Sequence, residues 1–213
     1  MSQTIVVPQS AVPRTFERSM LDTAAFLQSA SRYYNDRWKL HEFDPSGIKL
    51  PPHQPGFGWG VLVPPASVQV TAQRLYNKLG ERFATWKYPS ESLDEVLDPD
   101  KEVRPPSETG HSHIIWCRDV VEADECHRSK SADQITEAKI NGIGLVERLL
   151  LEDFLLYLEW IEHLDIRNAT LCTGSRFRDG FVPLVSWSGE LVVSAIHPSV
   201  AYGDRRTRQV ISC

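Results

Sequence analysis

The sequence predicts an α+β fold, and three patterns carry that prediction. A long, strongly apolar segment from Leu145 to Leu164 predicts one core helix. Short β-rich segments at 169–177, 182–187 and 190–196 follow it and predict three strands joined by tight turns. Apolar residues at helical spacing near the N-terminus predict further helices. We therefore expect an antiparallel sheet with a C-terminal three-stranded meander, packed on the long helix with the N-terminal helices alongside.

The segment from Leu145 to Leu164 is the strongest helical signal in the chain. Its apolar residues cover more than half of the helix circumference, so we expect neighbours on several sides and predict that Leu150 and Phe154 are buried. Charged residues interrupt the apolar run, which excludes a membrane span. These charged residues are Glu147, Arg148, Glu152, Asp153, Glu159 and Glu162.

The C-terminal meander is predicted from its turns as well as its strands. Gly180 and Gly189 each follow a small polar residue, a pairing typical of two-residue hairpin turns. Pro183 falls near the start of its strand, where a missing N–H is tolerated. Another strand is expected at 112–117, which is rich in Ile and Trp, and we predict that it joins the same sheet. A short helix is expected over 131–140.

The N-terminal half is predicted to alternate between helices and proline-rich loops. Helical spacing of apolar residues predicts helices from about Thr15 to Trp38 and from about Ala66 to Trp86. Residues 44–65 contain six of the fourteen prolines and a glycine-rich stretch, and residues 87–110 are polar and proline-bearing. Proline and glycine at this density predict loops in both segments.

Composition and charge limit the classes of function. A chain of 213 residues with 41% hydrophobic and 24% charged residues can bury a core, and we expect a single domain over 1–213. Residues 90–165 carry a net charge of −12, which argues against a nucleic-acid-binding surface. Residues 166–213 are basic through arginine alone. These arginines fit either a local anion contact or docking onto the acidic middle of the chain.

The N-terminal segment and the cysteines predict a cytoplasmic protein. The first residues lack a basic segment followed by an apolar run, so no signal peptide is expected. The four cysteines lie far apart and form no C-x-x-C pair, which predicts free thiols in a reducing compartment. They are Cys117, Cys126, Cys172 and Cys213. No motif indicates a cofactor.

Cys172 and Arg178 have the spacing of a thiolate phosphatase loop, with small residues between them. In such a loop, backbone N–H groups and the arginine hold a phosphate, and the chain runs from a strand into a helix. Here Asp179 and Gly180 predict a hairpin turn followed by another strand. The sequence therefore favours a buried Cys172 in a strand over a nucleophile.

A second cluster has residue types that bind zinc. His111 directly precedes the strand predicted at 112–117, His113 and Cys117 lie on it, and Cys126 and His127 follow within ten residues of it. Histidine nitrogen and cysteine sulfur are the usual zinc ligands. Because the spacing matches no zinc motif, we expect a packed cysteine with exposed loop histidines, and no metal requirement for folding.

Polar residues beside apolar segments form the main candidate site. If the predicted strands are neighbours, six of these residues would converge at one edge of the sheet, where a small anion could bind. They are Arg118, Asp119, His163, Asp165, Ser175 and Arg176. The alternative is a structural network of ion pairs, because buried charges need partners. We expect Arg176 to pair with a carboxylate, for which Asp119, Glu122 and Asp165 are the candidates.

Taken together, these patterns predict a binding or accessory protein without covalent chemistry of its own. Its partner would be another protein or a small anionic ligand, and the aromatic loop Gly56–Gly60 is a candidate recognition loop. The alternative is a small enzyme that acts on an anionic molecule at the six polar residues. Titratable groups within hydrogen-bond reach of one another in a cleft would favour the enzyme.

Overall fold

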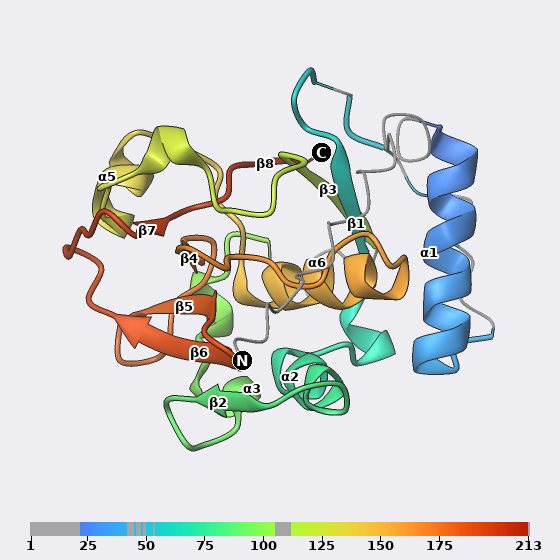
Figure 1. Cartoon of the computed structure of the whole chain (residues 1–213), viewed down its shortest axis with the longest axis horizontal. Coiled ribbons are helices and arrows are strands. Elements are labelled where there is room, and N and C mark those ends of the chain that lie inside the picture. The colour runs from blue at the N-terminus through green and yellow to red at the C-terminus, as the bar shows by residue number, and fades with distance from the viewer. Residues whose placement is uncertain are drawn as a thin grey trace, which may run out of the picture.

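Helices pack against two separate β-sheets in the computed structural model, so the predicted α+β class is confirmed (Figure 1). The structure describes residues 22–41, 45, 48, 50–52, 54–104 and 112–212. The parts of the predicted first helix and second loop that fall on 15–21 and 105–110 lie outside the described residues.

The larger sheet has five strands in the order β2-β6-β5-β4-β7. Its centre is the antiparallel meander of β4 (Ala169–Leu171), β5 (Val182–Trp187) and β6 (Leu191–Ile196). Two short strands extend it at the edges. β2 (Thr85–Lys87) pairs in parallel with β6, and β7 (Arg205–Arg206) pairs in parallel with β4. The sheet is therefore mixed and not purely antiparallel as predicted.

The smaller sheet contains the strand that we expected to join the meander. β3 (His113–Cys117) instead pairs antiparallel with β1 (Trp59–Val63) on one side and with β8 (Val210–Ser212) on the other. Every residue of β1 is buried, and Val61 faces Ile115 in the register. A fully buried apolar strand is the better partner for β3, because both strands can then be covered on both faces.

The strand β1 also corrects the prediction of a loop over 44–65. Its five residues fit between Pro55 and Pro64, so the density of prolines did not prevent a short strand. Gly60 is required within it, because a Cβ atom there would lie 2.4 Å from the ring of Trp116 on β3. The glycine that suggested a loop instead lets a tryptophan lie flat across the sheet.

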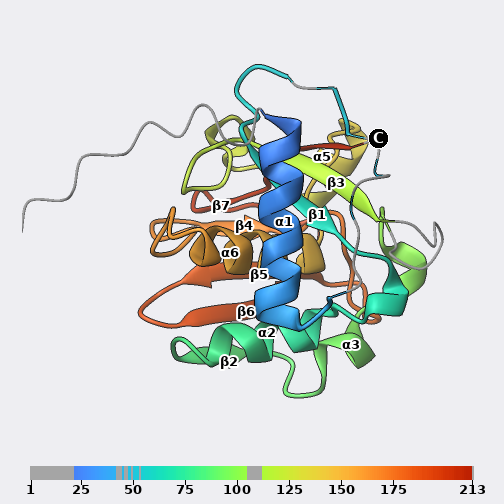
Figure 2. The same ribbon diagram turned by 90° about the vertical axis from the view of Figure 1, so that its right-hand side faces the viewer.

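The helix α6 (Leu145–Tyr157) lies between the two sheets (Figures 1 and 2). Leu150 and Phe154 are at most 1% exposed, so their predicted burial is confirmed. The helix is shorter than predicted, because Glu159 adopts a left-handed conformation with φ of 58° and ends it. On the other side of the meander, α5 (Ala132–Glu137) contributes to a separate small apolar cluster. Ser131 caps the N-terminus of this helix.

The N-terminal helix α1 (Thr23–Trp38) runs across β1 and α6 and closes one side of the core (Figure 2). Asp22 caps it by accepting hydrogen bonds from the N–H groups of Ala24 and Ala25. Capping of this kind satisfies N–H groups that have no partner within the helix.

The helix predicted from Ala66 to Trp86 divides into three elements. A 3₁₀ turn η1 (Ala66–Val68) precedes α2 (Ala72–Gly80), and the chain then enters β2. Gln69 interrupts the predicted helix with φ of 55°, and Thr71 caps the start of α2. The predicted loop at 87–110 likewise contains α3 (Leu93–Val96) and η2 (Pro99–Lys101).

Buried ion pairs join α6 to the segments that follow it. The guanidinium of Arg148 contacts Glu152 at 2.6 Å and Asp165 at 2.8 Å, and Arg208 contacts the other oxygen of Asp165 at 2.7 Å. All four side chains are fully buried. The two arginines lower the pKa of Asp165 despite its burial, so this carboxylate is ionised.

We expect Asp165→Asn to destabilise the fold by about 3–5 kcal/mol, because it leaves two buried guanidinium groups without their shared anion. Urea unfolding of the variant and the wild type at pH 7 measures this difference. Asp119→Asn removes an exposed carboxylate and should change stability by less than about 0.5 kcal/mol. An equally small effect of Asp165→Asn would show that the network contributes little.

Candidate functional site

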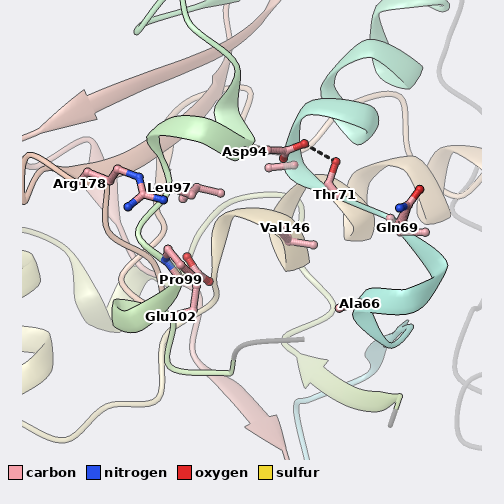
Figure 3. Close-up of a pocket in the computed structure, with 11 residues that line it drawn as sticks. Ala66, Gln69, Thr71, Asp94, Leu97, Pro99, Glu102, Val146 and Arg178 are labelled. Carbon is pink, nitrogen blue, oxygen red and sulfur yellow. Dashed lines mark hydrogen bonds between the residues drawn. The ribbon is translucent and has the colours of Figure 1, made fainter. Parts of the chain in front are cut away.

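A mainly apolar cavity of about 240 Å³ lies between η1 and α2 on one side and α3 and η2 on the other (Figure 3). Val146 of α6 lies between these two sides in the close-up. The apolar lining consists of Ala66, Val70, Ala72, Leu97, Pro99 and Val146. The polar lining consists of Gln69, Thr71, Asp94, Glu102 and Arg178. An apolar cavity with a few convergent polar groups is the usual form of a ligand site.

Hydrogen bonds between the walls hold the shape of the cavity. The hydroxyl of Thr71 donates to Asp94 at 2.7 Å, and the N–H of Gln73 donates to the other oxygen of Asp94 at 3.0 Å. On the opposite wall, Arg178 donates through Nε to the carbonyl of Glu95 at 2.7 Å. The cavity is therefore formed by ordered elements that are tied to one another.

Glu102 is the polar group of the cavity with the most perturbed chemistry. Its Oε2 accepts a hydrogen bond of 2.9 Å from the hydroxyl of Ser175, while its Oε1 is buried without a hydrogen-bond partner among the described residues. The pKa of Glu102 is raised to about 7, mainly by burial and also by the nearby carboxylate of Glu147, against the lowering effects of Ser175 and two arginines. A substantial fraction of this carboxyl group is therefore protonated near neutral pH.

The neighbouring Glu147 has a cationic partner, which Glu102 lacks within the described part of the chain. Arg104 contacts both oxygens of Glu147, at 2.6 and 2.7 Å, and His113 lies 3.4 Å from one of them. These partners hold the pKa of Glu147 well below its usual range. Among the described residues, no cation lies within ion-pair distance of Glu102. One carboxyl group is therefore paired with a cation, and the other is not.

The segment after β4 brings Ser175 to this site. Its hydroxyl oxygen accepts the N–H of Leu145 at 2.8 Å, so it caps α6 as well as donating to Glu102. Gly174 allows the close approach, because a Cβ atom there would lie 2.7 Å from the carbonyl oxygen of Gly142. Cys172 is fully buried, and burial raises the pKa of its thiol well above the usual value, which disfavours the thiolate that a nucleophile requires.

The six residues of the predicted site have separate partners and do not form one cleft. Arg118 lies 3.4 Å from Asp124, and its neighbour Asp119 is exposed. His163 stacks on Trp187 and lies 3.4 Å from Glu152.

The remaining three of the six residues divide between two places. Asp165 belongs to the buried network of Arg148 and Arg208. Ser175 and Arg176 lie near Glu102, and both affect its pKa. The prediction that Arg176 pairs with a carboxylate is wrong, since it donates to the carbonyl groups of Thr173 and Ser175 at 3.0 and 2.8 Å.

The cluster of residue types that bind zinc also divides. His113 contacts Glu147, and the buried thiol of Cys117, whose pKa rises to about 12, donates to the carbonyl of Trp59. His111 lies outside the described residues. Cys126 and His127 remain close together, beside Asp124.

Scans of family models, curated proteins and solved structures each found no match to the chain. Within the described residues, no helix combines the length and the apolar character that crossing a membrane requires. A function for the protein is therefore inferred from the geometry of the site.

We expect Glu102→Gln to remove a pH dependence of stability. Because the pKa of Glu102 is raised on folding, the folded protein holds a proton that the unfolded chain has released between about pH 4.5 and 7. This contribution is present at low pH and is lost as the pH rises through 7. Relative to the wild type, the variant should gain up to about 3 kcal/mol between pH 5 and pH 8.

Urea unfolding at several pH values measures this difference. Glu137→Gln, at an exposed position on α5, is the matched control and should leave the pH dependence unchanged. Parallel stability curves for the wild type and Glu102→Gln would contradict the assignment.

Proposed function

We propose that this protein is an intracellular binding protein for a small, mainly apolar molecule that carries an amine. The single observation that supports this proposal best is the uncompensated carboxyl group of Glu102 in an apolar cavity. The cavity volume of about 240 Å³ is slightly below the roughly 300–1,000 Å³ of drug-sized sites, so the ligand is small. Buried free thiols at Cys117 and Cys172 are typical of a reducing compartment.

The chemistry of the lining favours an amine over an anion. Glu102 and Asp94 contribute two acidic groups, whereas Arg178 is the cation of the lining and is already hydrogen-bonded to Glu95. An ammonium group would supply the positive charge that Glu102 lacks, and the pairing would lower the pKa of that carboxyl group. The apolar part of the ligand would contact Leu97 and Val146. Binding should therefore strengthen as the pH rises through 7.

The alternative function, an enzyme for an anionic molecule, has weaker support. Its six proposed residues have separate partners, and Asp165 is enclosed by Arg148 and Arg208. A reaction needs its acid, base and substrate within hydrogen-bond reach of one another. We therefore propose binding without covalent chemistry and place the site at Glu102.

Three small probes of similar shape test the proposal. They are 2-phenylethylamine, 2-phenylethanol and 3-phenylpropanoic acid, which differ mainly in the charge of the polar end. At pH 8 we expect the amine to bind at least about tenfold more tightly than the alcohol, with no binding of the acid. Methyl NMR shifts of Leu97 and Val146 measure binding at the cavity itself.

Two variants separate the apolar and polar contributions. Val146→Phe fills the cavity and should abolish binding of the amine, whereas Val120→Phe at an exposed position outside the cavity should not. Glu102→Gln should reduce the affinity for the amine to that for the alcohol. Binding of the acid as tight as that of the amine would contradict the proposal.

A further inference from the structure

Three residues after β3 bring metal-binding atoms together outside the cavity. Asp124, Cys126 and His127 lie in and just before the 3₁₀ turn η3 (Glu125–His127). One carboxylate oxygen, the thiol sulfur and one ring nitrogen all lie within 4.8 Å of one another. Tetrahedral zinc needs ligand atoms about 3.3–3.8 Å apart, so small side-chain rotations would complete the geometry.

Two of the three candidate ligands, Asp124 and His127, are buried and have polar atoms without hydrogen bonds to the described residues. His127 is 5% exposed and Asp124 is 2% exposed. Neither ring nitrogen of His127 has a hydrogen bond of ordinary geometry among the described residues, although the side chain of Gln209 is near enough to affect its pKa. Oδ1 of Asp124 is also without a hydrogen-bond partner there. Buried polar atoms normally have partners, so this group points to a ligand.

The surroundings orient Asp124 without using its free oxygen. The N–H of Gln209 donates to Oδ2 at 2.8 Å, and Nε of Arg118 lies 3.4 Å from the same oxygen. The carbonyl of Asp124 accepts the N–H of His127 at 3.0 Å, which fixes the turn between them. Hydrogen bonds of this kind hold metal ligands in place in known sites.

The third ligand lies at the surface. Cys126 is exposed, and together with Asp124 it lines a cleft of about 680 Å³. Water therefore reaches this side of the cluster and could supply a fourth ligand, as in zinc sites with three protein ligands. A carboxylate and a thiolate would bring two negative charges to a divalent cation, and Arg118 beside Asp124 offsets part of that charge.

From this geometry we infer that Asp124, Cys126 and His127 form a zinc-binding site with one open position facing the cleft. Thiolate and imidazole ligands select zinc over magnesium and calcium, which prefer oxygen. The site is separate from the cavity at Glu102, and neither proposal depends on the other.

Titration of the full chain with Zn²⁺ and with Co²⁺ tests the site. We expect one zinc ion per chain by calorimetry under reducing conditions, and a rise in melting temperature with zinc. Co²⁺ should give the visible bands of tetrahedral coordination together with a thiolate charge-transfer band. Mg²⁺ at the same concentration should produce neither effect.

Three variants assign the ligands. Cys126→Ser changes an exposed residue, so its apo melting temperature should match the wild type while the charge-transfer band is lost and zinc affinity falls at least tenfold. Asp124→Asn and His127→Gln should also weaken zinc binding at least tenfold. His197→Gln, at an exposed histidine outside the cluster, should leave zinc binding unchanged. A charge-transfer band that persists in Cys126→Ser, or a wild type that binds no zinc, would overturn the inference.

Discussion

Charges buried along α6 determine how the other elements are placed around it. Four of its charged side chains are at most 4% exposed, and a charge in the interior is stable only with a partner. They are Glu147, Arg148, Glu152 and Asp153. Three of them have partners from other parts of the chain: Asp153 binds Tyr33 and Arg37 of α1, Glu147 binds Arg104, and Arg148 binds Asp165. Glu152 binds Arg148 on the same helix. The segments that pack against this helix are therefore determined by charge as well as by shape.

The same constraint explains why Glu102 is the group of the cavity with the most perturbed pKa. Ser175 reaches it only because Gly174 presses against the loop before α6 and lets the serine cap that helix. Arg104 lies close enough to lower the pKa of Glu102, yet its hydrogen bonds go to Glu147 and to neighbouring backbone and amide groups. Glu102 is thus buried by the packing of the helix but left without a cation. An unpaired acid of this kind beside apolar walls is a common feature of binding sites.

The sequence predicted the elements whose signals are local. Burial of Leu150 and Phe154 follows from apolar residues on most faces of the helix, and Gly180 and Gly189 have the positive φ expected of turn residues. The connections are longer than the predicted two-residue turns, because 172–181 joins β4 to β5 and 188–190 joins β5 to β6. The partner of β3 could not be predicted, because pairing between distant strands depends on which faces remain uncovered after folding. Gly60 wrongly suggested a loop for the same reason. The requirement for a glycine at this position is apparent only when Trp116 lies beside it.

The candidate site was harder to predict than the fold. Glu102 lies in a polar, proline-bearing segment, and nothing in its local sequence separates it from the exposed acids around it. Its raised pKa comes from burial and from the carboxylate of Glu147, which lies far along the chain. Of the six predicted residues, Ser175 and Arg176 lie near this carboxyl group, whereas Asp165 serves the buried network. Ion-pair partners set these roles, and the sequence does not show which charges meet.

The most direct measurement is the titration of Glu102 itself by carbon-13 NMR of side-chain carboxyl groups. The resonance is assigned by its loss in Glu102→Gln. We expect a midpoint near pH 7 in the free protein, because burial without a cation disfavours the ionised form. A midpoint near the ordinary glutamate value of about 4.5 would show that water or a cation already satisfies this group, and would contradict the central claim.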